Sequence, residues 1–139
     1  ITMNNEVAFK LDGYKFTKAI LNFDIPQKAE LDINFKPSGK FYEKDGCYKL
    51  FFDTAVIYKE KDTVVISISC IASFSFNGKI RFNDIPEFFY PNSLAIIFPY
   101  IRAFVSTLSL QANTSPIVLP TVNLMGLTDI LCKNTSVVK

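Results

Sequence analysis

The stretch TVVISISCIASFSF, residues 63 to 76, alternates between apolar positions and positions that are mostly serine. The apolar positions are Val64, Ile66, Ile68, Cys70, Ala72, Phe74 and Phe76. Side chains of a β-strand point to opposite faces in turn, so this period of two predicts one long strand with one buried face. The serine-rich face suits solvent or a hydrogen-bonded neighbour.

Three stretches upstream show the same period. They are YKLFFDTAVIY (48–58), AELDINFK (29–36) and YKFTKAILNFDI (14–25). In the last of these the alternation slips near Lys18 and Ala19, and a β-bulge would explain the slip. We therefore expect strands in all three places.

The links between these strands are short and polar. Residues 43–46 end in an Asp-Gly turn signal, and residues 59–62 are equally polar. Four consecutive strands with tight links predict an antiparallel meander. Asn77-Gly78 either ends the last strand or forms a hairpin into residues 79–82, and the sequence leaves both open.

From Ser93 to Asn113 the period changes to that of a helix. Its polar stripe consists of Arg102, Ser106, Ser109 and Asn113. Nearly all other positions are apolar, which is more than one-sided packing on a sheet requires. Pro99 lies either in the first turn of a helix that starts near Phe98 or at a kink in a helix that starts at Asn92. We favour the first turn.

The remainder of the chain predicts a loop and a short helix. Residues 113–120 read as an extended loop with prolines, and Asn123 is placed to cap a helix over 124–132. The predicted fold is α+β: a four-stranded antiparallel β-meander packed by one long C-terminal helix, followed by a short second helix. The length predicts a single domain over residues 1–139.

The composition indicates surplus apolar surface. Hydrophobic residues make up 49% of the chain, and 14 of its 139 residues are phenylalanine. Each buried phenylalanine contributes about 1.5–3 kcal/mol, so the load is large for one small domain. Either a homo-oligomer interface or grooves for segments of other chains would use this surface.

The charge, the hydrophobic pattern and the cysteine content indicate which partners and which cell compartment to expect. The net charge of +2 does not indicate a basic surface for nucleic acid. The chain contains no run of 18 or more apolar residues, so we expect no membrane-spanning segment. No signal-like segment opens the chain, whose first residue is Ile1, which leaves a start upstream or at Met3 open. Three scattered cysteines favour reduced thiols and a cytoplasmic protein.

Several residue combinations that carry enzyme chemistry are missing. The chain has no histidine, which excludes Ser-His and Cys-His catalysis and histidine zinc sites. It also has no phosphate-binding or dinucleotide glycine motif. Glu30 and Asp32 share one strand face, but a solvated face explains them better than an acid/base pair. We expect no enzyme activity, no catalytic residue, no metal and no cofactor.

Two motifs in the C-terminal third carry a family resemblance. FPYIRAFVSTL (98–108) followed by PIVLPTVNL (116–124) resembles the SecB family of protein-export chaperones. The matching residues are Phe98, Pro99, Tyr100 and Arg102 in the first motif, and Pro116, Leu119, Pro120, Val122 and Asn123 in the second. The resemblance implies a homotetramer, a dimer of dimers with the long helices between dimers.

The resemblance also implies a function. SecB-like proteins are holdases that bind unfolded or aggregation-prone polypeptides in apolar grooves without ATP. The groove residues that it implies are Tyr100, Phe104, Leu119, Pro120, Val122, Leu124 and Leu127. For the oligomer interface it implies Ile97, Ile101, Val105 and Leu108.

The departures from the family concern the SecA motor. The family's acidic first-strand pattern reads Ile-Leu-Asn-Phe-Asp here (20–24), so that Asp24 is the one candidate motor-binding acid, and the acidic tail is replaced by KNTSVVK. Coupling to SecA is therefore doubtful. The alternatives are a bacterial or phage-encoded guardian of an antitoxin in a toxin–antitoxin system, and a scaffold oligomer of the same fold without client activity.

Overall fold

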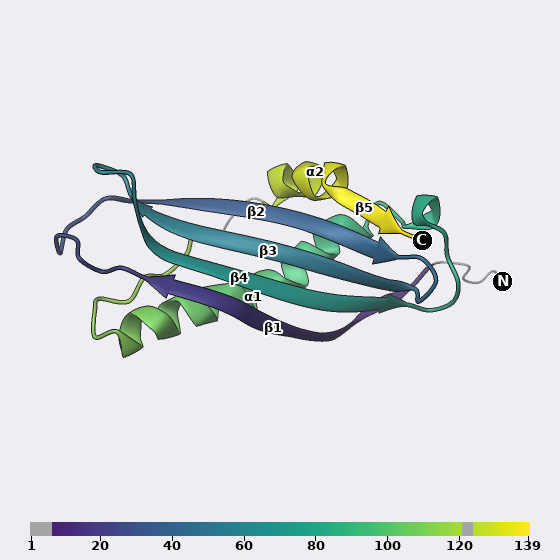
Figure 1. The fold of residues 1–139 in the computed structure, drawn as a ribbon, viewed down its shortest axis with the longest axis horizontal. Helices are drawn as coiled ribbons and strands as arrows, with labels where there is room; N and C mark the ends of the chain where they lie inside the picture. Colours follow the sequence, from purple (N-terminus) through teal and green to yellow (C-terminus); the bar gives the residue numbers. More distant parts are fainter. Residues whose placement is uncertain (1–6, 121–123) are drawn as a thin grey trace.

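The computed structural model describes residues 7–120 and 124–139, which form a five-stranded sheet with one long helix across its back (Figure 1). The predicted α+β class is confirmed. The strands are β1 (Phe9–Leu21), β2 (Leu31–Tyr42), β3 (Cys47–Tyr58), β4 (Thr63–Phe76) and β5 (Thr135–Val138). The helices are the 3-10 turn η1 (Phe82–Asp84), α1 (Phe89–Gln111) and α2 (Met125–Lys133).

The strand order β1-β4-β3-β2-β5 corrects the predicted meander in two ways. First, β2, β3 and β4 follow one another as antiparallel hairpins, but β1 pairs with β4 and not with β2. Second, β5 adds a fifth strand, parallel to β2. Four residues are too few to show a period, so the sequence did not reveal it.

Register shifts change which side chains of β1 and β4 face the core. The predicted slip in β1 is a register shift between Phe16 and Lys18. In β4 a second shift leaves Val65 without a partner on β3. Val64 is therefore 41% exposed and Val65 fully buried, so the predicted alternation of β4 is reversed at this end and holds from Ile66 onward.

The core lies between the sheet and α1. Phe89, in the first turn of α1, is its aromatic centre: its ring centroid is 4.8 Å from Phe9, 4.6 Å from Tyr48 and 5.0 Å from Phe76. Such ring pairs add about 0.5–1.5 kcal/mol each beyond their buried area. The aromatic surplus of the sequence is thus partly used inside one chain.

Pro99 lies in the interior of α1, so the predicted first-turn position is wrong. The helix begins at Phe89, and the proline in its first turn is Pro91. Pro99 has no N–H for the carbonyl of Ala95, but both residues are exposed, so water can bond that carbonyl. The α1 helix is also long and apolar enough to cross a membrane by length and composition, a test that a core helix on a sheet also passes.

The structure also gives the end of β4 and the start of the second helix. Asn77-Gly78 ends β4, and residues 79–81 form no strand before η1. The second helix begins at Met125, close to the prediction. The predicted cap Asn123 lies outside the described residues.

Candidate functional site

A cavity of about 750 Å³ opens at the end of the sheet where β1 leaves it and β2 enters. Three segments surround it: the β1–β2 connection, the inner face of β2 and β3, and the loop after α1. The lining residues are Phe23, Ile25, Pro26, Gln27, Ala29, Leu31, Ile33, Val56, Asn113, Thr114, Ser115, Pro116, Ile117, Val118 and Pro120. None of them is charged, but Gln27, Asn113, Thr114 and Ser115 add polar groups to the apolar lining. The cavity therefore suits an uncharged occupant with both apolar and polar groups.

The polar stripe of α1 holds the loop that lines one side of this cavity. Arg102 Nε donates to the carbonyl of Leu119 at 3.1 Å, and Ser106 Oγ donates to the carbonyl of Ile117 at 2.9 Å. Ser109 Oγ accepts from the N–H of Ile117 at 2.9 Å. Arg102, Ser106 and Ser109 therefore tie the loop that follows α1 back along the helix, whereas Asn113 lies beyond the end of α1 and is exposed. Val118 consequently stands 66% exposed at the cavity.

Of the predicted groove residues, Pro120 lines the cavity. Leu119 is fully buried in the core, which corrects its assignment to an open groove. Leu124 and Leu127 are half-buried and pack against the core beside α2. Val122 lies outside the described residues. The structure thus divides the predicted set among separate places.

Tyr100 and Phe104, the other predicted groove residues, belong to a second apolar surface. The ring of Tyr100 stacks on Tyr14 at 4.4 Å, and the ring of Phe104 stacks on Phe16 at 3.9 Å. Tyr14 and Tyr100 are each 41% exposed, and Ile96 on the same side of α1 is 36% exposed. We call these five residues the helix–β1 surface.

The predicted interface residues lie on the other side of α1. Ile97, Ile101 and Val105 are fully buried against the sheet, and Leu108 is half-buried. A side chain that a subunit buries in its own core is not available to a neighbour, so the interface assignment of these three is corrected. The face of α1 that remains open is the one with Ile96 and Tyr100.

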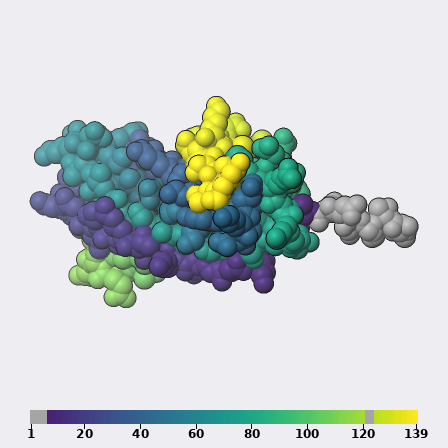
Figure 2. Space-filling view, turned by 45° about the vertical axis from the view of Figure 1, so that its right-hand side comes forward, coloured from purple at the N-terminus to yellow at the C-terminus, as the bar shows by residue number. Residues whose placement is uncertain are grey.

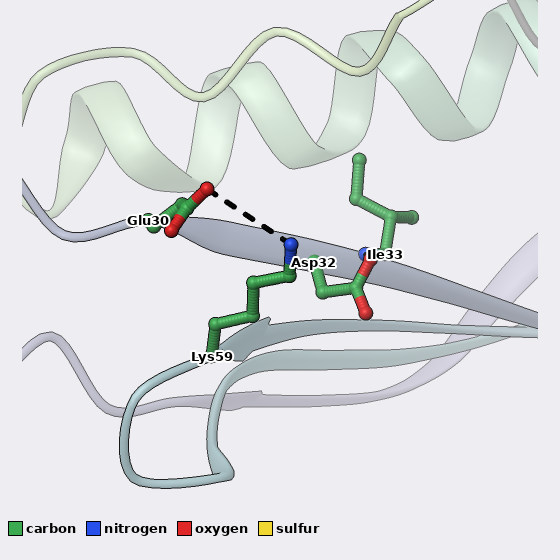
Figure 3. A network of polar contacts seen from close by, with 4 residues as sticks. All are labelled: Glu30, Asp32, Ile33 and Lys59. Atoms are coloured by element: carbon green, nitrogen blue, oxygen red, sulfur yellow. Dashed lines mark hydrogen bonds and ion pairs between the residues drawn. The ribbon is translucent and has the colours of Figure 1, made fainter.

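Glu30 and Asp32 do not form an acid/base pair (Figure 3). A carboxylate oxygen of Glu30 lies 3.9 Å from Lys59 Nζ in an exposed ion pair, which contributes little to stability. Asp32 Oδ1 accepts from the N–H of Ile33 at 3.1 Å. The candidate motor-binding acid Asp24 is exposed in the β1–β2 connection, beyond the end of β1.

The outer face of the sheet, away from α1, is rich in lysine. By strand register the basic side chains on this face are Lys10, Lys15, Lys18, Lys36, Lys40 and Lys49. The carboxylates beside them are Asp12, Asp32 and Asp53. The balance of this face is therefore positive.

The ionisable groups in the core are not arranged for catalysis. Burial raises the pKa of the Cys70 thiol to about 11 and that of Tyr90 to about 12, which keeps both neutral. Within residues 7–120 and 124–139 no group of three or more histidine, cysteine or acidic residues could hold a metal ion.

Comparison with known proteins gives a relative by sequence and a likeness by structure. No model of a known protein family matches the chain. The uncharacterized protein MJ0357 of Methanocaldococcus jannaschii is 30% identical over 130 residues, covering 86% of this chain and 82% of that protein. A Streptococcus agalactiae protein of unknown function aligns over 84% of this chain, but with a TM-score of only 0.38.

The structural likeness is to the Rv1957 SecB-like chaperone of Mycobacterium tuberculosis, solved with a ChAD peptide from the Rv1956 HigA1 antitoxin. The TM-score is 0.69 over 83% of this chain and 88% of that one, at 12% identity. At this identity the likeness shows a shared fold.

Proposed function

The chain belongs to the family of the uncharacterized Methanocaldococcus jannaschii protein MJ0357, and from its SecB-like fold and its uncharged cavity we propose that it is a chaperone for unfolded or aggregation-prone polypeptides. It acts in the cytoplasm as a holdase, without ATP and without enzyme chemistry. The alternative that keeps the fold but not the activity is a scaffold oligomer.

The observation that carries this proposal is the uncharged cavity of about 750 Å³ at the open end of the sheet. A scaffold has no need of an open, uncharged cavity with apolar walls from β2 and β3, whereas a chaperone needs a site that native proteins cannot fill. Native proteins bury their apolar segments and so offer nothing to it, whereas an unfolded chain offers extended apolar segments. Recognition of this kind depends on exposure more than on sequence.

Avidity supports the same proposal. One apolar segment in one cavity is a weak interaction, but several cavities on one oligomer bind several segments of the same chain at once. Each further contact is then intramolecular, and the overall affinity exceeds that of a single cavity. We therefore propose a homotetramer, a dimer of dimers, as the working form.

The helix–β1 surface is the place for subunit contact. Its Tyr14, Ile96 and Tyr100 side chains are exposed, and Phe16 and Phe104 beside them are half-buried. Within the described residues β1 pairs along one edge only, with β4. Ile96→Asp should dissociate the oligomer and leave the fold intact, because this side chain is 36% exposed. Sedimentation of a stable wild-type monomer at micromolar concentration would refute the tetramer.

The clients that fit are unfolded preproteins or an antitoxin-like chain. The likeness to a chaperone solved with an antitoxin peptide favours the second class. The lysines of the outer sheet face disfavour coupling to the SecA motor through acidic residues, and Asp24 alone does not reverse that balance.

A binding assay with a matched pair of variants tests the proposal. Fluorescence anisotropy of a labelled, permanently unfolded protein should report binding to wild type without ATP. Val118→Asp places a charge at the cavity and removes a valine side chain that a bound client would cover. Binding should weaken about 10-fold, the cost of losing the burial of one valine. Val64→Asp changes an equally apolar residue, 41% exposed on β4 and absent from the cavity, and should bind like wild type. Equal weakening by both variants would argue against the cavity as the site.

A further inference from the structure

We propose that client segments bind as an added β-strand along the first half of β2, in line with β5 and beside the cavity. This inference rests on the proposed chaperone function and names the form in which the client is held.

The backbone of β2 shows which groups are open. Lys59 directly follows β3, and its N–H donates to the carbonyl of Glu30, which directly precedes β2, at 3.0 Å. Because backbone groups alternate along a strand, the even-numbered residues of β2 form hydrogen bonds with β3. The N–H of Gly39 donates to the carbonyl of Asn134 at 3.2 Å, so odd-numbered residues bond toward the opposite edge. Along that opposite edge the backbone groups belong to Leu31, Ile33, Phe35 and then Pro37.

The chain itself fills half of this edge. The β5 strand pairs with β2 from Gly39 to Tyr42, and the N–H of Glu43 donates to the carbonyl of Val138 at 3.0 Å. Figure 2 shows this C-terminal segment, in yellow, seated on the blue surface of β2. A short segment with two valines thus already binds here as a parallel strand. The edge therefore has the geometry and depth to accept a strand.

The other half of the edge has no strand partner among residues 7–120 and 124–139. Pro37, which has no N–H, separates it from the half that β5 occupies. At Ile33 the N–H donates to the neighbouring Asp32 carboxylate at 3.1 Å (Figure 3). A side chain beside the strand here takes the place of a partner strand, and an incoming backbone carbonyl could replace it.

The cavity gives this edge its selectivity. Leu31 and Ile33 present edge backbone groups and also line the cavity with their side chains. A strand added beside them would direct every second side chain toward the cavity, and the others toward the outer face with Asp32 and Lys36. The occupant that fits is an extended segment that alternates apolar with polar residues, held by main-chain bonds and sorted by its apolar positions.

Amide hydrogen exchange measured by NMR tests this mode directly. The protein is observed alone and saturated with a synthetic peptide in which valine or leucine alternates with serine or lysine. The amide of Phe35 should exchange at least about 10-fold more slowly in the complex, the effect of one added hydrogen bond of about 1.4 kcal/mol. The amide of Ile33 already donates to Asp32 and would only change its acceptor, so Phe35 is the reporter. The amide of Gly39, already bonded to β5's side, is the internal control and should not change.

A second arm uses peptides that are N-methylated at alternate amides, on the odd or on the even positions. Strand addition predicts that one of the two sets binds at least about 10-fold more weakly, because it loses the donors that face β2. Equal affinity of both sets, with Phe35 exchange unchanged on binding, would overturn strand addition and leave the chaperone function in place. A parent peptide and an unfolded protein that both fail to bind would overturn the proposed function itself.

Discussion

Gly39→Ala is expected to lower the free energy of unfolding by disturbing the contact between the C-terminal strand β5 and the sheet. A Cβ at position 39 would overlap the hydroxyl and Cζ of Tyr48 and lie 2.9 Å from its Cε1. The Tyr48 side chain is fully buried, and its ring packs on Phe89 at 4.6 Å. The ring cannot move aside without leaving the core, because these neighbours surround it.

The same displacement breaks a hydrogen-bond chain. Tyr48 Oη and Thr135 Oγ1 lie 2.6 Å apart, and Thr135 Oγ1 donates to the carbonyl of Leu131 at 2.7 Å. The one proton of Thr135 is thereby used, so Tyr48 is the donor of the pair. Overpacking of this kind costs about 1–3 kcal/mol, and a buried hydroxyl left without its partner costs about 1–3 kcal/mol more.

The expected loss in the free energy of unfolding is therefore about 2–6 kcal/mol, measured by urea titration followed by circular dichroism. Gly13→Ala is the matched control, because a Cβ there meets nothing within 4 Å, and it should stay within about 0.5 kcal/mol of wild type. Tyr48→Phe in the Gly39→Ala background should recover only part of the loss, since the ring carbons still overlap. Equal stabilities of the two alanine variants would refute the reasoning.

Three further predictions concern the core and the faces of α1. Thr54→Val should raise the free energy of unfolding by about 1 kcal/mol, because Thr54 Oγ1 is buried with no hydrogen-bond partner in the described part of the chain; a lower value by urea titration would contradict this. Ile97→Asp should unfold the chain, whereas Ile96→Asp should only change its sedimentation; the opposite pattern would mean that the faces are assigned the wrong way round. The free energy of unfolding should be level through neutral pH and fall as pH rises from about 9 to 12. In the folded state burial raises the pKa of Cys70 from 9.0 to about 11 and that of Tyr90 from 10.0 to about 12, so the unfolded chain loses these protons at lower pH. A free energy of unfolding that rises over this range would exclude that cause.

Much of the fold could be predicted from the sequence because its strands are long and one-sided. β4 matches its predicted bounds, and the buried face of β3 follows its period of two. Strand order could not be predicted in the same way. The pairing of β1 with β4 depends on how the chain packs as a whole, and nothing in the alternation of either strand encodes it.

The candidate site was predicted less well, for a physical reason. The hydrophobic pattern of α1 shows that many positions are apolar, but not which of them face the sheet. The polar stripe was clear in the sequence, yet its role in holding the loop at Ile117 and Leu119 depends on contacts between segments. The cavity lining from Phe23 to Ile33 was missed for the same reason, although the apolar residues of the β1–β2 connection were a usable signal.

Aggregation of a chemically denatured test protein, diluted into buffer without ATP and followed by light scattering, tests the chaperone proposal most directly. A several-fold molar excess of this protein should suppress the scattering, and Val118→Asp should suppress it less well than Val64→Asp at equal concentration. Full scattering in the presence of folded, oligomeric wild-type protein would contradict the chaperone function and leave the scaffold oligomer as the better explanation of the fold.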